Sequence, residues 1–518
     1  MRGARRNARL FLKSKIGVIG LAIILFFVIL AVFAPYITTN NPVFGYNVSS
    51  PYSVPEWATV FPRYHDLAVT SYPVDANSFA GPTDVSQFSY AGSNIAYAAA
   101  PLVGPPGNLT KYSGSLMVNF SAAAAPAGQS TNPYLPGGQP VFVMTKSFQY
   151  TTKPPTNFVV SAFVDPASMT NVSAVYVNFK MLAPNGANYS FSSLGSYALK
   201  QEVEITPQQF GAWKNVTIPS GLLPLSGLPG FEGSSNSAQA VFSQTGTYTF
   251  SMELQVVPSG SHARGTFYLT GVTFHILGKA YGLLGTDIYG RDLWSQFVWG
   301  SQVSLLIGVL SAVGAVGIGT VTGLVAGYLG GGPDELISRV TDFVLVLPFL
   351  PLAIVLISFL GQNPALYQNI YAWVIGLFVV LSWPGITRII RGQVLTVKER
   401  PYVEASRALG GGPMHIIRRH IFPNVMGLVY SQTALNVSGF IILEAALDFL
   451  AVGIHPINTV TWGLTLTNAL SDALTNSTVD YAWWWFLPPG FAIAALSLAF
   501  VLVGFALDRI FNPRLRAR

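Results

Sequence analysis

The sequence predicts an α-helical polytopic membrane protein that carries an inserted extracytoplasmic all-β domain. Hydrophobic residues make up 51% of the 518 residues and charged residues only 9%, whereas a soluble domain carries about 25% charged residues. Apolar runs long enough to cross a bilayer fall into two unequal groups. This composition excludes an ordinary cytosolic enzyme, and the absence of cysteine from the sequence excludes disulfide scaffolds, thiol catalysis and Cys-ligated metals.

Six apolar segments of about 20 residues or more are the candidate transmembrane helices. The first stands alone near the N-terminus, within residues 1–40. It is too long for the core of a signal peptide and no A-x-A cleavage site follows it, so we interpret it as an uncleaved anchor. The six segments are Ile16–Ile37, Ser301–Leu329, Leu336–Leu360, Ile370–Ile390, Val425–Val452 and Trp485–Leu507.

The distribution of lysine and arginine predicts the orientation. With the N-terminus inside, short inner segments hold 18 of the 28 Lys and Arg residues. This bias predicts a multi-pass protein of the cell (plasma) membrane, with both termini cytoplasmic and the long segment 38–300 outside. The net charge of +7 is therefore a topology signal, and no nucleic acid partner is expected.

The long outer segment has two parts. Residues 41–139 are rich in Pro, Gly and Ser and show little periodicity, whereas residues 140–278 contain strand patterns separated by turn clusters. These patterns predict an antiparallel, jelly-roll-like β-sandwich. The last run resembles the closing strands of carbohydrate-binding jelly rolls; a spacer or docking domain is the alternative. The predicted strands are Pro140–Met144, Asn157–Phe163, Ala174–Lys180, Ala198–Ile205, Thr247–Val257 and Gly265–Ile276.

Sequons and sparse charge support an outer position for this segment. Residues 38–285 contain only nine acidic and nine basic residues. Because carboxylates with a pKa of about 4 are neutral in strong acid, we hypothesise an acidic external medium. The N-x-S/T sequons predict seven candidate glycosylation sites: Asn47, Asn108, Asn119, Asn171, Asn188, Asn215 and, in the last outer loop, Asn476.

The segment between the fourth and fifth spans, about residues 401–423, is the most informative. It indicates a short helix with Glu404 in its first turn, a Gly-Gly-Pro break, a basic second helix and then Pro423 at the start of the next span. The small residues Ala405 and Ser406 allow close approach by another chain. A rigid elbow of this kind suits transmission of force to a separate subunit; a plain amphipathic connector is the alternative.

This segment resembles the EAA loop of bacterial and archaeal ABC importer permeases. Glu404, Ala405, Gly410 and Pro423 stand at the family's spacings, and the sequence departs from the family pattern at three positions, Ser406, His420 and Phe422.

A second stretch resembles the GTDxxGRD segment that precedes the second span in C-type permeases of dipeptide and oligopeptide importers. It contains Gly285, Thr286, Asp287, Gly290, Arg291 and Asp292. Shorter matches occur at Gly300, Trp383–Gly385, Leu443–Ala445, Trp462–Gly463 and Asn512–Leu515. The family usually has only a short loop where this chain has its long outer insertion.

The resemblance implies a type I ABC importer permease fold, with residues 279–518 as the permease core. Glu404 through Gly410, with Arg407 among them, would sit in a groove on a cytoplasmic ATPase. The implied partners are a homologous second permease, two such ATPases, an extracytoplasmic solute-binding protein and membrane lipid. The family points to di- or oligopeptides as substrates, and the jelly-roll likeness to oligosaccharides.

No enzymatic site is expected in this chain. The sequence contains no G-x-x-x-x-G-K-[ST] phosphate-binding loop, so ATP and Mg are expected in the partner ATPases and no cofactor here. The scattered histidines form no ligand set, so no catalytic or metal residues are expected.

Glu444 and Asp448 lie one helical turn apart inside the fifth span. Ionisable residues within a membrane are functional candidates by default, and these two either line the translocation path or form a structural pair. Two other functions compete with the importer permease. A membrane-anchored carbohydrate-binding or adhesion protein has no need of the elbow, and a secondary transporter predicts internal repeats with broken helices, which the sequence does not show.

Overall fold

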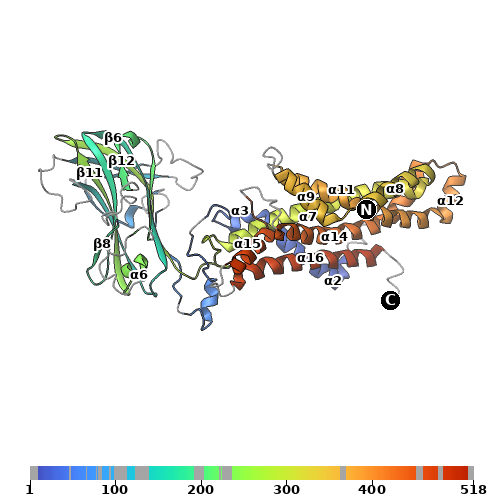
Figure 1. Ribbon diagram of the computed structural model, residues 1–518, viewed down its shortest axis with the longest axis horizontal. Helices are drawn as coiled ribbons and strands as arrows, with labels where there is room; N and C mark the ends of the chain where they lie inside the picture. The colour runs from blue at the N-terminus through green and yellow to red at the C-terminus, as the bar shows by residue number, and fades with distance from the viewer. Residues whose placement is uncertain are drawn as a thin grey trace. The chain divides into compact units, whose positions relative to one another are not determined.

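The computed structural model divides the chain into two compact units, which are described separately (Figure 1). The helical unit comprises Met1–Tyr46 and Arg291–Arg518, and the β unit comprises Asn47–Gly290. The structure describes residues 10–45, 48–65, 67–76, 79, 85–92, 95–98, 114–122, 139–191, 203–220, 223, 236–361, 369–450, 459–475 and 482–511.

The helical unit is built from long apolar helices. Among the described residues, five helices are long and apolar enough to cross a membrane, and a sixth span results if one bent pair is counted. The five are α2 (Lys15–Val32), α7 (Leu293–Leu329), α11 (Ile370–Lys398), the continuous run Pro413–Phe449 and α16 (Trp483–Phe511). The shorter helices are α3 (Ala34–Ile37), α12 (Pro401–Ala408) and α15 (Trp462–Thr475).

The predicted third span, Leu336–Leu360, is not one continuous helix. Helix α8 (Gly331–Val346) and helix α9 (Phe349–Gly361) are bent by 81° relative to each other. The bend follows from Pro348, because a proline disfavours the α conformation of the residue before it. Leu347 is accordingly extended, with φ −67° and ψ 131°.

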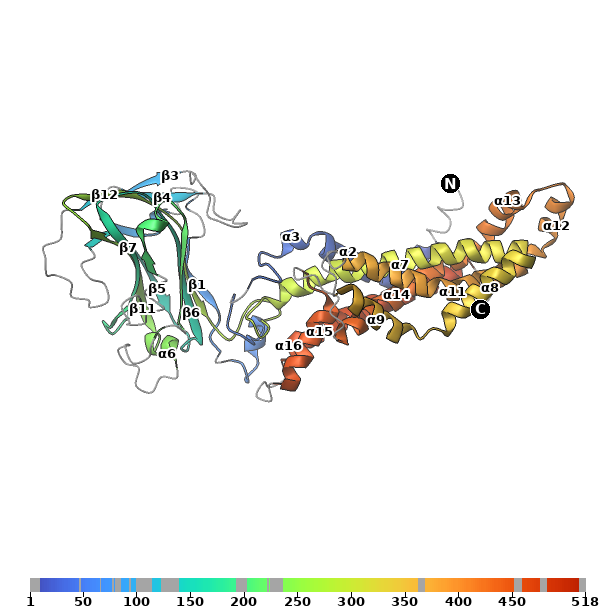
Figure 2. The ribbon, with the colours of Figure 1, turned by 45° about the horizontal axis from the view of Figure 1, so that its top comes forward.

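Helices α7 and α11 run parallel and in very close contact. An added Cβ at Gly319, Gly323 or Gly327 of α7 would lie 2.7–2.8 Å from the Cβ atoms of Ile386, Ile390 and Val394 of α11, respectively. This glycine ladder therefore sets the distance between the two helices, as small residues do in membrane proteins generally. Figure 2 shows the two helices side by side.

Helices α2 and α16 pack in the opposite sense. Gly17 faces Ala506, while Gly20, further along α2, faces the backbone of Ala499, which lies earlier in α16. The two helices are therefore antiparallel, and the start of α2 lies beside the end of α16. The start of α14 lies there too, because a Cβ at Gly427 would collide with Phe511. Within this unit, α12 lies at one end of the bundle and α3 and α15 at the other (Figures 1 and 2).

The β unit is an antiparallel sandwich, as the strand patterns predict. One sheet has the order β10-β6-β12-β4-β3 with β1 also paired to β12, and the other has the order β2-β5-β11-β7-β8 with β9 also paired to β7. The strands are β1 (Ser71–Ala76), β2 (Ser89–Gly92), β3 (Ile95–Ala98), β4 (Ser115–Ala122), β5 (Gln139–Tyr150), β6 (Asn157–Thr170), β7 (Val172–Leu182), β8 (Asn188–Ser190), β9 (Glu204–Ile205), β10 (Lys214–Pro219), β11 (Gly246–Pro258) and β12 (Ala263–Leu277).

The sequence boundary at residue 140 does not match this sandwich. Four strands, β1 to β4, come from the segment 41–139 and pair with strands of both sheets. The sequence patterns did not indicate them, because three of the four have six residues or fewer and the segment is rich in Pro, Gly and Ser. The predicted strand Ala198–Ile205 lies mostly outside the described residues, and its described end forms β9.

Aromatic rings fill the space between the two sheets. Phe250 of β11 and Phe274 of β12 come from different sheets, and their ring centroids are 5.5 Å apart. Phe158 and Phe242 pack against the same Phe274 ring, at 5.6 and 6.1 Å. These side chains are fully buried, so the sandwich has a conventional water-excluding core.

Candidate functional site

Helix α12 has well-formed signals at both ends. Arg400 is extended, and Pro401 occupies the first helical turn, where its missing N–H costs nothing. At the other end Gly410 is left-handed, with φ +83°. The Gly410 N–H donates to Arg407 O and the Gly411 N–H to Ser406 O, at 3.0 and 2.9 Å. This pair of bonds is a Schellman motif, so the helix ends sharply where the sequence predicts.

The second half of the elbow joins α14 without a break. Helix α13 (Pro413–Ile416) leads into a π-helical turn over Ile417–Ile421, and α14 (Phe422–Phe449) follows. Pro423 has no N–H to donate to the preceding turn, and the wider π-helical turn lies just before its ring. The basic residues of the elbow thus sit on a direct extension of a long apolar helix.

Most of α12 is exposed and one residue anchors it. Val403 is fully buried, whereas Glu404, Ala405 and Arg407 are exposed. Large apolar side chains are exposed as well: Leu409 is 89% and Met414 is 60% accessible. The elbow therefore combines a fixed backbone with a solvent-facing surface of mixed apolar and charged character.

Two ion pairs join helices α8 and α11 near the end of the bundle that carries the elbow. Arg391 Nε and Nη2 donate to the two carboxylate oxygens of Asp334, each at 2.6 Å, and Arg388 pairs with Asp342. The sequence patterns did not indicate either of these pairs. The partners are 46 and 57 residues apart in the sequence, so only the packing of α8 against α11 brings them together.

The carboxylates Glu444 and Asp448 of α14 are both 1% exposed. Ser304 of α7 donates to Glu444 Oε2 at 3.1 Å, and Thr461 donates to Asp448 Oδ2. Thr467 of α15 also donates to the main-chain oxygen of Asp448, at 3.0 Å. The structure thus places the pair inside the contact between α7, α14 and α15.

The same contact gathers several of the shorter sequence matches. Trp462, at the start of α15, is fully buried and donates its indole N–H to Phe297 O at 2.8 Å. A Cβ at Gly300 would lie 2.8 Å from Trp462, and one at Gly463 would lie 2.6 Å from Asp448 Cβ. Helix α15 was not predicted, because its 14 residues are too few for a span.

The Gly285–Asp292 stretch makes chiefly structural hydrogen bonds. In the β unit, Thr286 is buried and its hydroxyl donates to Ser50 O at 2.6 Å, while Gly285 and Gly290 are left-handed. Buried Asp287 accepts from the Tyr289 N–H at 2.8 Å. In the helical unit Asp292 caps α7 by accepting from the Trp294 N–H at 3.0 Å; its neighbour Arg291 is half-buried.

Four of the seven sequon asparagines lie in the described residues, and all four are exposed on the sandwich: Asn119, Asn171, Asn188 and Asn215. Asn171 adopts a positive φ of 58° and donates its amide to Ser261 O at 3.1 Å. Asn47, Asn108 and Asn476 lie outside the described residues. Within the described part of the chain, no group of three or more His, Asp or Glu side chains is placed to bind a metal.

The helical unit, with its apolar spans and protruding elbow, defines a multi-pass membrane protein of the permease class. The family profile described as "Binding-protein-dependent transport system inner membrane component" matches residues 319–517. The profile "N-terminal TM domain of oligopeptide transport permease C" matches residues 4–53. The chain belongs to this family, as a permease subunit of the dipeptide and oligopeptide ABC transporter type.

Individual relatives agree with the profiles. The chain is 35% identical to the dipeptide transport system permease protein DppC of Bacillus subtilis, over 45% of this chain and 68% of that protein. It is 36% identical to the di/tripeptide transport system permease protein DppC of Pseudomonas aeruginosa, over 48% of this chain and 78% of that protein. Family membership disfavours both the adhesion protein and the secondary transporter, although the bend between α8 and α9 is a broken span that the sequence did not show.

Some solved structures show a remote likeness to the chain. The Family 11 Carbohydrate-Binding Module from Clostridium thermocellum shares 13% identity over 42% of this chain and 99% of that chain, with a TM-score of 0.20. The mannan-recognising module TmCBM27 shares 10% identity over 40% of this chain and 99% of that chain, with a TM-score of 0.19. Scores this low carry no argument about function.

Proposed function

We propose that this chain is one permease subunit of an ATP-driven importer of di- or oligopeptides. It forms the translocation path with a homologous second permease and receives substrate from an extracytoplasmic solute-binding protein. Two cytoplasmic ATPases supply the energy, and ATP and Mg bind to them. The elbow around α12 is the coupling element.

The observation that carries this proposal is the combination of rigidity and exposure at α12. The helix is fixed by Pro401 at its start and by the Schellman motif at Gly410. Its outer surface, including Glu404 and Leu409, is open to solvent. A protruding element that keeps its shape can pass the movement of a bound ATPase directly into α14, which continues from it.

The orientation rests on which chain segments share one end of the helical unit. The start of α2, the end of α16 and the elbow lie at one end. The end of α3 and the start of α7 meet at the other, where Trp299 donates to Thr38 Oγ1 at 2.8 Å. The chain therefore leaves and re-enters the helical unit at the end opposite the elbow. If the elbow is cytoplasmic, both termini are cytoplasmic and the inserted sandwich is extracytoplasmic.

We assign Glu444 and Asp448 a structural role. Both side chains are enclosed by α7, α14 and α15, and each accepts a hydroxyl hydrogen bond. This arrangement supports the pairing alternative over the path alternative, because a side chain that lines a path must be open to it.

Charge reversal on α12 tests the coupling role. We expect Glu404→Arg to reduce co-purification of the ATPase and substrate-driven ATP hydrolysis by about tenfold or more, the loss typical of a central interface residue. Glu335→Arg, an equal charge reversal at an exposed position on α8, is the control and should retain both. Retention of ATPase and transport by Glu404→Arg would show that coupling occurs elsewhere.

A second experiment tests the substrate class. The relatives are named for peptides, whereas oligosaccharides are suggested only by strand patterns in the insertion. Calorimetric titration of the cognate solute-binding protein with di- and oligopeptides and with oligosaccharides separates the two. Binding of sugars alone would overturn the peptide assignment and leave the coupling proposal intact.

A further inference from the structure

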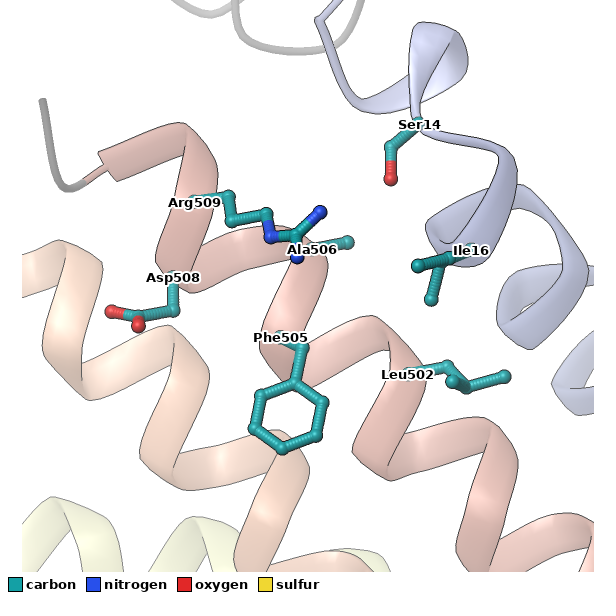
Figure 3. Close-up of a pocket in the computed structure, with 7 residues that line it drawn as sticks. All are labelled: Ser14, Ile16, Leu502, Phe505, Ala506, Asp508 and Arg509. Atoms are coloured by element: carbon teal, nitrogen blue, oxygen red, sulfur yellow. The ribbon is translucent and has the colours of Figure 1, made fainter. Parts of the chain in front are cut away.

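A pocket of about 320 Å³ lies between the start of α2 and the last turns of α16 (Figure 3). Ile16, Leu502, Phe505 and Ala506 form an apolar part. Ser14, Asp508 and Arg509 provide its polar groups. In Figure 3, Arg509 and Ser14 point toward the space between the two helices, whereas Asp508 points to the opposite side of α16. The pocket is thus apolar along one side and cationic at its end.

The polar end has unused capacity for an anion. Arg509 is exposed and forms no ion pair with any residue that the structure describes. The Ser14 hydroxyl oxygen accepts from the Gly17 N–H at 3.2 Å, so its own O–H can donate to another group. Ser14 also caps the 18-residue helix α2, whose first N–H groups and dipole favour a negative charge there. The exposed Lys13 and Lys15 flank this cap.

The apolar side continues along α16 as a stripe. Phe491, Leu498 and Phe505 recur every seven residues and so lie on one face of the helix; their exposed fractions are 69%, 54% and 56%. Such a face within a membrane span contacts acyl chains. The pocket joins a polar end that carries Arg509 to an apolar surface along α16. This combination fits a phospholipid, whereas free phosphate would make no contact with the apolar surface.

We propose that this pocket binds the phosphate of an anionic phospholipid, with its acyl chains along Leu502 and Phe505. Arg509 is the principal phosphate ligand, because guanidinium groups present a fork of donors that matches phosphate oxygens. Ser14 and the start of α2 supply further donors. The bound lipid joins the first and last spans at the end of the bundle that carries the elbow.

The test uses the full chain, purified and reconstituted into nanodiscs of phosphatidylcholine with a tenth of phosphatidylglycerol. Native mass spectrometry counts the lipids that remain bound after release. We expect the wild type to retain phosphatidylglycerol above its share of the mixture. Arg509→Gln should reduce that enrichment about fivefold, the effect of one arginine near an anionic lipid.

Arg339→Gln is the matched control, since it removes one charge from an exposed arginine on α8 and should leave the enrichment unchanged. Phe505→Ser, which keeps the cationic cap, should also weaken retention, and millimolar inorganic phosphate should not displace the lipid. Equal loss in Arg509→Gln and Arg339→Gln, no enrichment in the wild type, or full displacement by inorganic phosphate would each overturn the proposal.

Discussion

Most of the exposed phenylalanines among the described residues lie in the helical unit, although Phe378 of that unit is fully buried. In the β unit Phe158, Phe250 and Phe274 are fully buried between the sheets, whereas in the helical unit Phe359 and Phe491 are 68% and 69% exposed. The position of a phenylalanine side chain thus depends on whether water or lipid surrounds the unit. Water drives it into the core of the sandwich, and lipid lets it remain on the surface of a helix.

The helical unit therefore needs another source of cohesion. Lipid is as apolar as the side chains that it contacts, so helices in a membrane are held by close packing and hydrogen bonds. The glycines at helix contacts and the hydroxyl–carboxylate bonds of Glu444 and Asp448 supply both. The comparison predicts that truncating an aromatic ring will matter in one unit and that enlarging a glycine will matter in the other.

The largest effect is expected from Phe274→Ala in the sandwich. Loss of a fully buried ring costs about 3–5 kcal/mol. Phe491→Ala on the exposed face of α16 should change the stability of the isolated chain by no more than about 0.5 kcal/mol. Hydrogen–deuterium exchange of the full chain, read in β11 and β12 and in α16, measures both. Similar destabilisation by the two variants would contradict the two-solvent comparison.

A smaller loss of stability is expected in the helices, where the variant enlarges a residue instead of truncating one. Gly463→Ala places a Cβ 2.6 Å from Asp448 Cβ, and overpacking of this kind costs about 1–3 kcal/mol. Gly376→Ala is the control, because the added Cβ meets no other part of the described chain within 4 Å beyond its own stretch of helix and alanine favours a helix by about 1 kcal/mol. Thermal unfolding in detergent distinguishes them. A neutral Gly463→Ala would show that α15 is held loosely.

The smallest effects concern pH and are tested in the β unit. Burial raises the pKa of the Asp165 carboxyl above its usual value. A raised folded-state pKa contributes stability at pH values below the unfolded pKa, near 4, and that contribution is lost as the pH rises through the folded pKa. We expect Asp165→Asn to raise the melting temperature of the sandwich at neutral pH and to leave it unchanged in strong acid. A lower melting temperature at neutral pH would contradict this.

The pKa shift of His275 has the opposite direction to that of Asp165. Burial lowers the pKa of its imidazole, against the attraction of Asp75. Its stabilising contribution is present above the unfolded pKa, near 6.5, and is lost as the pH falls through the folded pKa. His275→Gln should therefore improve melting in acid and change little at pH values above about 7. If acid melting does not improve, His275 is not an acid-sensitive point, and the two residues together bear directly on the hypothesis of an acidic medium.

Features that depend on neighbouring residues in the chain were predictable from the sequence. Continuous apolar runs predicted the five long apolar helices but not the bend in the third segment, and the Gly-Gly-Pro break predicted the end of α12 near Gly410. Features that depend on distant residues were not. The Asp334–Arg391 pair joins residues on different helices. The position of α15 is set by Trp462, which packs beside Gly300 of α7. Strands β1 and β4 both pair with β12, more than a hundred residues further along the chain, so their place in the sandwich depends on a distant partner.

The glycine ladder between α7 and α11 limits how this protein can move. Each step sets a β-branched side chain of α11 against a bare backbone of α7 at four-residue intervals, so a slide of less than one full turn meets a steric barrier at three points together. The two helices behave as a single lever. Rearrangement of the spans must therefore use other joints, and the 81° corner at Leu347, where Pro348 interrupts the span, is the natural pivot.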